Sequence, residues 1–298
     1  MDLDAASAFL AGHARQLDRH RFGLLAGTGD PTATRAALAG YGNPDGGFGW
    51  GLEPDLRSPE SQPAAALHAF EVLAETGPGD ADLAGPLCDW LASVTLPDGG
   101  VPFALPVTEP AGTSHWWIGA DQAASSLQIT SAVAGQAHRA AGLDPVIAGH
   151  PWLDRATDFC LRAIAATERP HAHELMFSLR FLDAVHDSRP EAPALLERLA
   201  ALVPADGGTP VQGGIEGEAM HLLDLSPEPG RPLRALLDPD AVEKDLDRLE
   251  SLQQDDGGWV VDFDSSSAAG ALEWRGYQTV WAARILLAHG RRPAATPS

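Results

Sequence analysis

Acidic, histidine and aromatic side chains gather in five short stretches, each at the entry to a segment that reads as a helix. Carboxyl groups transfer protons, and the faces of aromatic rings stabilise a nearby cation. Such stretches suit a carbocation, and equally a sugar that stacks on rings and is cleaved by paired carboxylates. They supply Trp50, Glu53, Asp55 and Arg57; His115, Trp116, Trp117 and Asp121; His171, His173 and Glu174; Glu216, Glu218, His221 and Asp224; and Asp262, Asp264, Glu273, Trp274, Arg275 and Tyr277.

Catalytic roles are predicted for five carboxylates. An acid that protonates an alkene must be kept protonated by burial or by a neighbouring acid. The candidates for this acid are Asp55, Asp262 and Asp264, with Glu53 and Glu273 expected to hold or tune it. The residues expected to bind substrate are Trp50, Arg57, His115, Trp116, Trp117, Asp121, His173, Glu174, Glu218, His221, Trp274, Arg275 and Tyr277.

Each of these features also has a structural interpretation. Carboxylates such as Asp55 or Asp262 could bond backbone amides or brace a turn, and the tryptophans could be core residues. His171 and His173, with Glu174 and His221, could supply metal ligands. His-x-His at a helix start is a loose signal, however, so the sequence predicts neither a metal nor a cofactor.

The elements that would position these side chains are marked by four Asp-Gly-Gly turns. Glycine permits the backbone angles of a sharp reversal, and aspartate can bond its own turn. The turns begin at intervals of 53, 108 and 50 residues, and a period near 50 indicates a repeat in which each unit is one supersecondary element. Their first residues are Asp45, Asp98, Asp206 and Asp256.

Helical segments flank these turns, and almost no stretch alternates like a strand. Eleven or twelve helices are expected, paired as outer and inner helices of five or six hairpins in an α/α toroid, with an open superhelix as the alternative. A single domain is predicted over residues 1–290, followed by a disordered tail at 291–298. The main predicted helices cover residues 2–27, 31–39, 60–76, 81–93, 122–141, 152–167, 171–185, 193–202, 241–254 and 272–289.

The last turn carries a more specific motif. Gln253-x-x-x-Gly257-x-Trp259 resembles the repeat of the terpenoid cyclase and protein prenyltransferase superfamily, known as the QW motif. The other three turns keep the glycines without the glutamine. The resemblance implies an all-α toroid with a central cavity, here as one domain. The stretches at 45–49, 52–57 and 272–277 also resemble those of bacterial proteins that carry this repeat.

The chain departs from that superfamily at its catalytic motifs. Class II terpene cyclases protonate an alkene with an Asp-x-Asp-Asp motif, and the sequence lacks that tetrapeptide. Its nearest counterparts are Asp262-Phe263-Asp264 and Glu53-Pro54-Asp55. Protein prenyltransferases bind zinc through Asp, Cys and His, but Cys88 and Cys160 do not stand in a matching context. Fold resemblance alone does not carry function.

Composition narrows the choice of partner. A formal net charge of −21 argues against nucleic acid or an anionic membrane surface. No apolar run suits a membrane span, and residues 1–4 lack the features of a signal peptide, so a cytoplasmic protein is expected. The two cysteines are expected to be buried and reduced.

These observations favour an isoprenoid cyclase-like enzyme, an isomerase or lyase, that starts cyclisation by protonating a hydrophobic small molecule. Two alternatives stay open, a carbohydrate-active toroid that uses paired carboxylates and a non-catalytic toroid that binds a small molecule or a partner. A cavity with mostly apolar walls favours the first, a wet cleft with two separated carboxylates favours the second, and a filled cavity favours the third.

Overall fold

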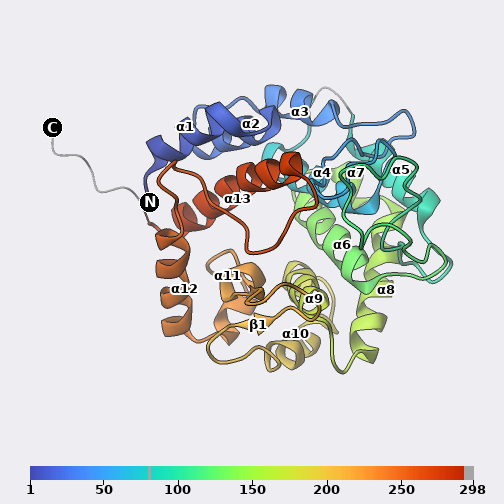
Figure 1. The fold of residues 1–298 in the computed structure, drawn as a ribbon. Helices are drawn as coiled ribbons and strands as arrows, with labels where there is room; N and C mark the ends of the chain where they lie inside the picture. The colour runs from blue at the N-terminus through green and yellow to red at the C-terminus, as the bar shows by residue number, and fades with distance from the viewer. Residues whose placement is uncertain (80–81, 292–298) are drawn as a thin grey trace.

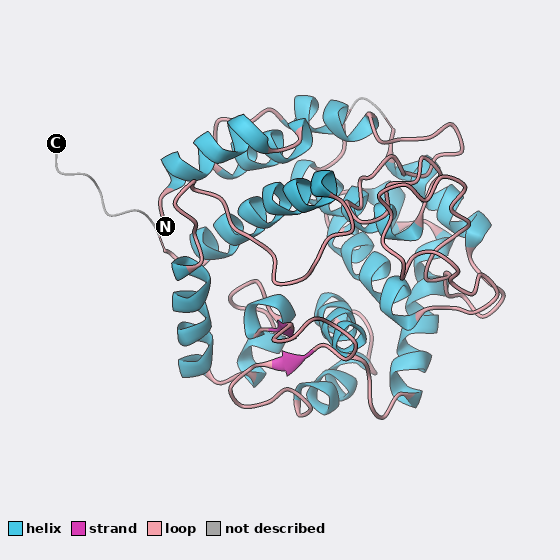
Figure 2. Cartoon of the chain, viewed as in Figure 1, coloured by secondary structure: helices cyan, strands magenta, loops and turns pink. Residues whose placement is uncertain are grey.

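The computed structural model describes residues 1–79 and 82–291, and almost all of their regular secondary structure is helical (Figures 1 and 2). The regular structure also includes a 3₁₀-helix, η1 (Leu233–Leu236). One antiparallel pair of short strands is formed by β1 (Thr209–Pro210) and β2 (Ala219–Met220). The α-helices are α1 (Leu3–His13), α2 (Gln16–Leu25), α3 (Pro31–Ala39), α4 (Pro63–Thr76), α5 (Ala84–Val94), α6 (Leu127–Ala141), α7 (Pro145–Ala148), α8 (Pro151–Ala166), α9 (Ala172–Val185), α10 (Ala192–Ala200), α11 (Leu222–Leu225), α12 (Pro239–Ser251) and α13 (Ala268–Ala288).

Most predicted helices are present, and the prediction of an all-α fold is confirmed. The single helix expected over residues 2–27 is wrong, because Ala14 and Arg15 adopt extended backbone angles between α1 and α2. The Arg15 guanidinium bonds Asp18 and the Leu52 carbonyl, which holds this corner. Helix α6 begins later than expected, at Leu127, because the Ser126 hydroxyl caps it.

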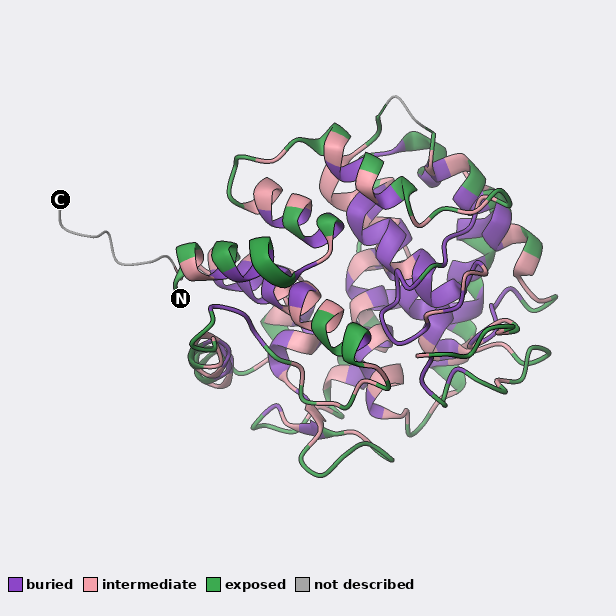
Figure 3. Cartoon of the chain, turned by 45° about the horizontal axis from the view of Figure 1, so that its top comes forward, coloured by how far each residue is buried: buried purple, intermediate pink, exposed green. Residues whose placement is uncertain are grey.

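Helix contacts run in a cycle. Helix α2 contacts α4, α4 packs on α6, α6 on α9, and α9 contacts α11. Helix α11 contacts α12, α12 contacts α13, and α13 returns to α1 and α2. Helices α3, α5, α8 and α10 lie at the periphery in Figure 1, each against a member of this cycle. Buried residues are most numerous on α4 and α6, and Figure 3 shows the buried residues gathered in the interior of the molecule.

The four Asp-Gly-Gly turns share one hydrogen-bond pattern. In each, an aspartate oxygen accepts the amide of the second glycine at 3.0–3.2 Å. The first glycine of each turn has a positive φ, which side chains disfavour. These glycines are Gly46 (+91°), Gly99 (+97°), Gly207 (+81°) and Gly257 (+90°).

Three of the turns also pack on the helix of a neighbouring unit. A Cβ atom at Gly46, Gly99 or Gly257 would come within 3.0 Å of a backbone carbonyl in another helix. The carbonyls belong to Pro86 in α5, Arg155 in α8 and Ala5 in α1. The contact that joins successive units therefore also joins the last turn to the first helix. Gln253 strengthens this junction, since its side chain bonds the Asp2 amide and carbonyl, both at 2.7 Å.

We expect Gly257→Ala to lower the free energy of unfolding by at least about 3 kcal/mol, because it adds a collision with α1 to an unfavourable φ. Gly213→Ala is the matched control, since Gly213 has φ +81° with open space around its Cβ position, and it should cost about 1–2 kcal/mol. Urea unfolding measures both. Equal losses would show that the junction of the last turn with α1 contributes little.

The described part of the chain ends at Arg291, which pairs with Glu243 at 2.8 Å and with Glu250. The predicted disordered tail otherwise lies outside the described residues. Cys88 and Cys160 are buried and free, as expected. Within residues 1–79 and 82–291, no helix has both the length and the apolar character that a membrane crossing requires.

Candidate functional site

A cavity of about 790 Å³ opens among the segments that precede α4, α6 and α13 and the hairpin β1–β2. This volume is in the range of small-molecule sites. Twelve of the predicted site residues line it, although they come from most of the length of the chain. They are Glu53, Asp55, His115, Trp116, Trp117, His173, Glu218, His221, Asp262, Asp264, Trp274 and Tyr277.

Six other predicted residues do not line this cavity: Trp50, Arg57, Asp121, Glu174, Glu273 and Arg275. Arg57 and Glu273 form an ion pair with each other, and the Arg275 guanidinium bonds Asp256 at 2.7 Å. Glu174 accepts the backbone amide of His171 in a capping box, which is a structural role.

The remaining two are held at turns. Trp50 is 58% exposed, and its indole donates to the Asn43 side chain at 2.7 Å. Asp121 accepts the amide of Ala123 at 2.9 Å within its own turn. In this structure neither side chain points its polar group into the cavity, so substrate binding by these two stays a prediction.

The Asp55 carboxyl is buried at the cavity wall and is held by uncharged donors. Its Oδ2 accepts the indole N–H of Trp274 at 2.8 Å, and its Oδ1 lies 2.5 Å from the Ser265 hydroxyl. Burial raises the pKa of Asp55, and the nearby Glu53 carboxylate adds to the rise, whereas hydrogen bonds from Ser265 and Trp274 oppose it. The site therefore favours a neutral carboxylic acid more than water does.

The Ser265 hydroxyl can serve both protonation states of Asp55. It donates to Oδ1 when Asp55 is ionised. When Asp55 is protonated on Oδ1, the Ser265 hydroxyl oxygen can accept a hydrogen bond from it. The hydroxyl then turns its own hydrogen toward the Ser267 carbonyl, 3.4 Å away. Loss and gain of a proton at Asp55 therefore need no movement of the backbone.

Behind Asp55 lies a buried chain of charged groups. Glu53 accepts the Asp55 backbone amide at 3.1 Å through one carboxylate oxygen, and its other oxygen lies 3.0 Å from His68 Nε2. His68 Nδ1 lies 3.2 Å from the Glu71 carboxylate. Glu71 also accepts the Tyr277 hydroxyl at 2.8 Å and pairs with Arg21 at 3.5 Å. Imidazolium and guanidinium therefore alternate with the two carboxylates.

This arrangement determines the protonation of its members. Burial works to lower the pKa of His68, but hydrogen bonds and Coulomb attraction from Glu53 and Glu71 outweigh it and raise the pKa to about 9. Burial works to raise the pKa of Glu71, but His68 and Arg21 lower it to about 2. Near pH 7, His68 is thus charged and Glu71 ionised.

We expect stability to fall as the pH rises from 6.5 to 9. The raised pKa of His68 gives a stabilisation that is complete below its unfolded value of about 6.5 and is lost as pH passes through 9, of order 3 kcal/mol. Urea unfolding across this range measures the loss. His68→Gln, which cannot titrate, should flatten the profile, and a profile unchanged by His68→Gln would contradict a charged His68.

Sequence reasoning missed His68, Glu71 and Ser265. A signal for the first two was present, because they stand three residues apart, share one face of helix α4, and are its only polar side chains before Glu75. Polar side chains in the buried middle of a helix need partners, which marks them as candidates. Ser265 gave no such signal in the serine-rich segment before α13.

Aromatic rings surround the Asp55 carboxyl on the α13 side. Trp274 meets Phe263 and Tyr277 edge to face, with ring centroids 5.3 and 5.4 Å apart. Across the cavity wall, Phe103 stacks on Trp117 at 4.7 Å. Ring faces attract cations, so this wall could stabilise positive charge.

The histidines near α9 have structural partners. His171 caps α9 and accepts the amide of His173, while burial and the neighbouring His171 lower the pKa of His173 to about 4. His173 is therefore neutral near pH 7. Among the described residues, no cluster of three or more His, Cys, Asp and Glu is arranged to hold a metal ion.

No protein-family model matches the chain, and no curated protein matches it in sequence.

Proposed function

We propose that the chain forms an α/α toroid related to the terpenoid cyclase and prenyltransferase superfamily. The cyclic order of helix contacts, from α2 through α6 and α13 back to α2, supports this arrangement. So does the junction of the Gly257 turn with α1, which repeats the contact between earlier turns and later helices. In this arrangement, the cavity beside Asp55 occupies the inside of the ring.

We further propose that the protein cyclises a linear isoprenoid, with Asp55 as the proton donor. The observation that carries this proposal is the buried Asp55 carboxyl, held by Ser265 and Trp274 and raised in pKa, beside a wall of aromatic rings. An acid that stays protonated and aromatic faces that stabilise a cation are what this chemistry requires.

The reaction would begin with transfer of the Asp55 proton to a terminal alkene carbon. A C–H bond forms, the alkene π bond is lost, and a tertiary carbocation remains beside the rings. The π electrons of the next alkene close a ring, and the last cation loses a proton or takes up water. Asp55 is left as a carboxylate, stabilised by Ser265 and Trp274, and regains its proton from solvent.

Asp55 fits this role better than Asp262 or Asp264. All three line the cavity, but Asp55 is 2% exposed, whereas Asp262 and Asp264 lie in the loop before α13 and are not buried. Burial disfavours the charged form of a carboxyl group, and of the three only Asp55 is buried.

A carbohydrate substrate is the second candidate, supported by the several carboxylates that share this cavity. Asp262 and Asp264 on one loop and Asp55 on another could act as base and acid on opposite sides of a glycosidic bond. The exposed position of Asp262 and Asp264 would admit the water that hydrolysis consumes.

Native mass spectrometry of the purified protein, followed by organic extraction, tests the proposal. A co-purifying isoprenoid, or conversion of linear isoprenoids to cyclic products of equal mass or one water heavier, is expected. A bound or cleaved oligosaccharide would instead support the carbohydrate candidate. A protein that holds neither ligand and is not stabilised by members of either class would indicate that the cavity serves a non-catalytic role.

A further inference from the structure

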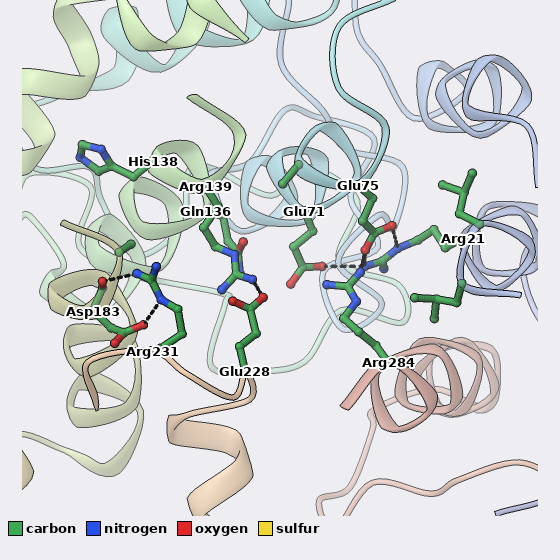
Figure 4. Close-up of a pocket in the computed structure, with 14 residues that line it drawn as sticks. Arg21, Glu71, Glu75, Gln136, His138, Arg139, Asp183, Glu228, Arg231 and Arg284 are labelled. Carbon is green, nitrogen blue, oxygen red and sulfur yellow. Dashed lines mark hydrogen bonds and ion pairs between the residues drawn. The ribbon is translucent and has the colours of Figure 1, made fainter. Parts of the chain in front are cut away.

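A second cavity, of about 580 Å³, is lined by Arg21 and Glu71, two members of the same buried chain of charges (Figure 4). Glu71 lines both cavities. The second is unlike the first in its lining, because it contains no aromatic side chain apart from His138 and is dominated by charged groups. Four arginines reach it from four separate segments, namely Arg21, Arg139, Arg231 and Arg284.

This concentration of guanidinium groups is unusual in so acidic a chain. The protein has 41 acidic and 20 basic residues, yet the cavity is lined by four arginines and four carboxylates. Guanidinium groups present forked donors that match the oxygens of carboxylate and phosphate groups. The cavity therefore offers guanidinium donors to an anion that can take the place of one of its carboxylates.

The arginines are balanced by carboxylates that differ in how firmly they are held. Asp183 bonds Arg231 at 2.9 Å and accepts the Leu233 backbone amide at 2.8 Å, so it is anchored twice. Glu75 pairs with both Arg21 and Arg284. These two carboxylates are thus integral to the packing of the helices around the cavity.

Glu228 is the exception. It comes from the loop between α11 and η1, its side chain is 36% exposed, and its recorded partner among the described residues is Arg139. In Figure 4 its carboxylate reaches into the cavity from this loop toward Arg139. A carboxylate held by one contact and open to water is the one that a competing anion could replace.

Burial works against the positive charge of two of these arginines. Burial lowers the pKa of Arg139, and its neighbours Arg180 and Arg231 lower it further. Burial and Arg21 lower the pKa of Arg284 to about 10. Burial thus disfavours the charged form of these guanidinium groups, and a bound anion in contact with them would favour it.

We propose that this second cavity binds a small oxyanion with two or more negative charges, which takes the place of the Glu228 carboxylate on Arg139 and also contacts Arg284. Phosphate, diphosphate and compact di- or tricarboxylates share the required chemistry. The Gln136 amide and the neutral His138 line the same cavity and add uncharged polar groups. This inference concerns binding alone and does not depend on the reaction proposed for the first cavity.

Isothermal titration calorimetry of the intact protein with inorganic phosphate, diphosphate and citrate tests the inference. We expect one site per chain, weakened by salt, for at least one of the three probes. Preference for diphosphate over citrate would identify a phosphate-type ligand, and the reverse a carboxylate-type ligand. No saturable binding of any probe at low salt would overturn the proposal.

Variants decide where the anion binds. Arg139→Gln should weaken binding at least about tenfold, because it removes a charged donor. Glu228→Gln should instead strengthen binding severalfold, because it removes the competing carboxylate. Arg291→Gln is the matched control, since Arg291 also pairs with carboxylates but lies outside the cavity. An equal loss in Arg139→Gln and Arg291→Gln, or weaker binding in Glu228→Gln, would contradict the proposed site.

Discussion

Replacing Asp55 with asparagine should lower turnover of a linear isoprenoid at least about 10²- to 10⁴-fold while the protein stays folded. The amide cannot supply the proton that starts the reaction. It can still accept the Trp274 indole N–H and donate to the Ser265 hydroxyl, so the local hydrogen bonds persist. Gas chromatography with mass spectrometry of the products measures turnover, and urea unfolding measures stability.

The effect of Asp55→Asn on the free energy of unfolding gives a second test, separate from turnover. Because the pKa of Asp55 is raised in the folded protein, ionisation at neutral pH costs stability, and Asp55→Asn should leave the free energy of unfolding at pH 7 unchanged or higher. Asp262→Asn is the matched control in the same cavity and should reduce turnover less than about tenfold. If Asp262→Asn lowered turnover more than Asp55→Asn, Asp262 rather than Asp55 would be the acid.

Replacing Glu71 with glutamine should lower the free energy of unfolding by about 3–5 kcal/mol near pH 7. His68 and Arg21 would then remain buried beside a neutral amide, with Glu53 as the nearest carboxylate of His68. Removing Glu71 should also lower the pKa of His68 from its value in the unmodified protein, and the loss should shrink as the pH rises past this new pKa, since the imidazole can then lose its proton. Urea unfolding at several pH values measures this.

Glu243→Gln provides the same chemical change at an exposed ion pair with Arg291, and it should cost about 1 kcal/mol or less. The double variant His68→Gln/Glu71→Gln should recover part of the loss, because it also removes the buried imidazolium that Glu71→Gln leaves with Glu53 alone. If Glu71→Gln costs no more than Glu243→Gln, the buried chain of charges does not stabilise the fold.

Local chain chemistry was enough to predict the helical framework. The Asp-Gly-Gly turns can be recognised in the sequence, because the positive φ of the first glycine and the bond between the aspartate and the turn backbone depend only on neighbouring residues. Asp30 and Pro31 marked the start of α3 for the same reason. The break between α1 and α2 escaped prediction, because Arg15 is held there by carbonyl oxygens of Gly51 and Leu52, far along the chain.

The candidate site could be predicted only in part. Residue types and their place at the entries to predicted helices led to Asp55, Trp274 and Tyr277, which do line one cavity. The same reasoning also predicted Arg57 and Glu273 as site residues, but they form an ion pair with each other and do not line the cavity. Composition of a loop indicates that polar groups lie near the end of a helix, but it does not give the direction in which each side chain points.

The sequence by itself determined the period, the turns and the gathering of acids and rings before certain helices. Tertiary structure alone decided which acid could stay protonated and which arginines share a cavity. Asp55 meets Ser265 and Trp274 across 210 and 219 residues, and Glu71 meets Arg21 across 50. The pKa of a carboxyl group depends on burial and on charges within a few ångströms, and those distances exist only once the chain has folded.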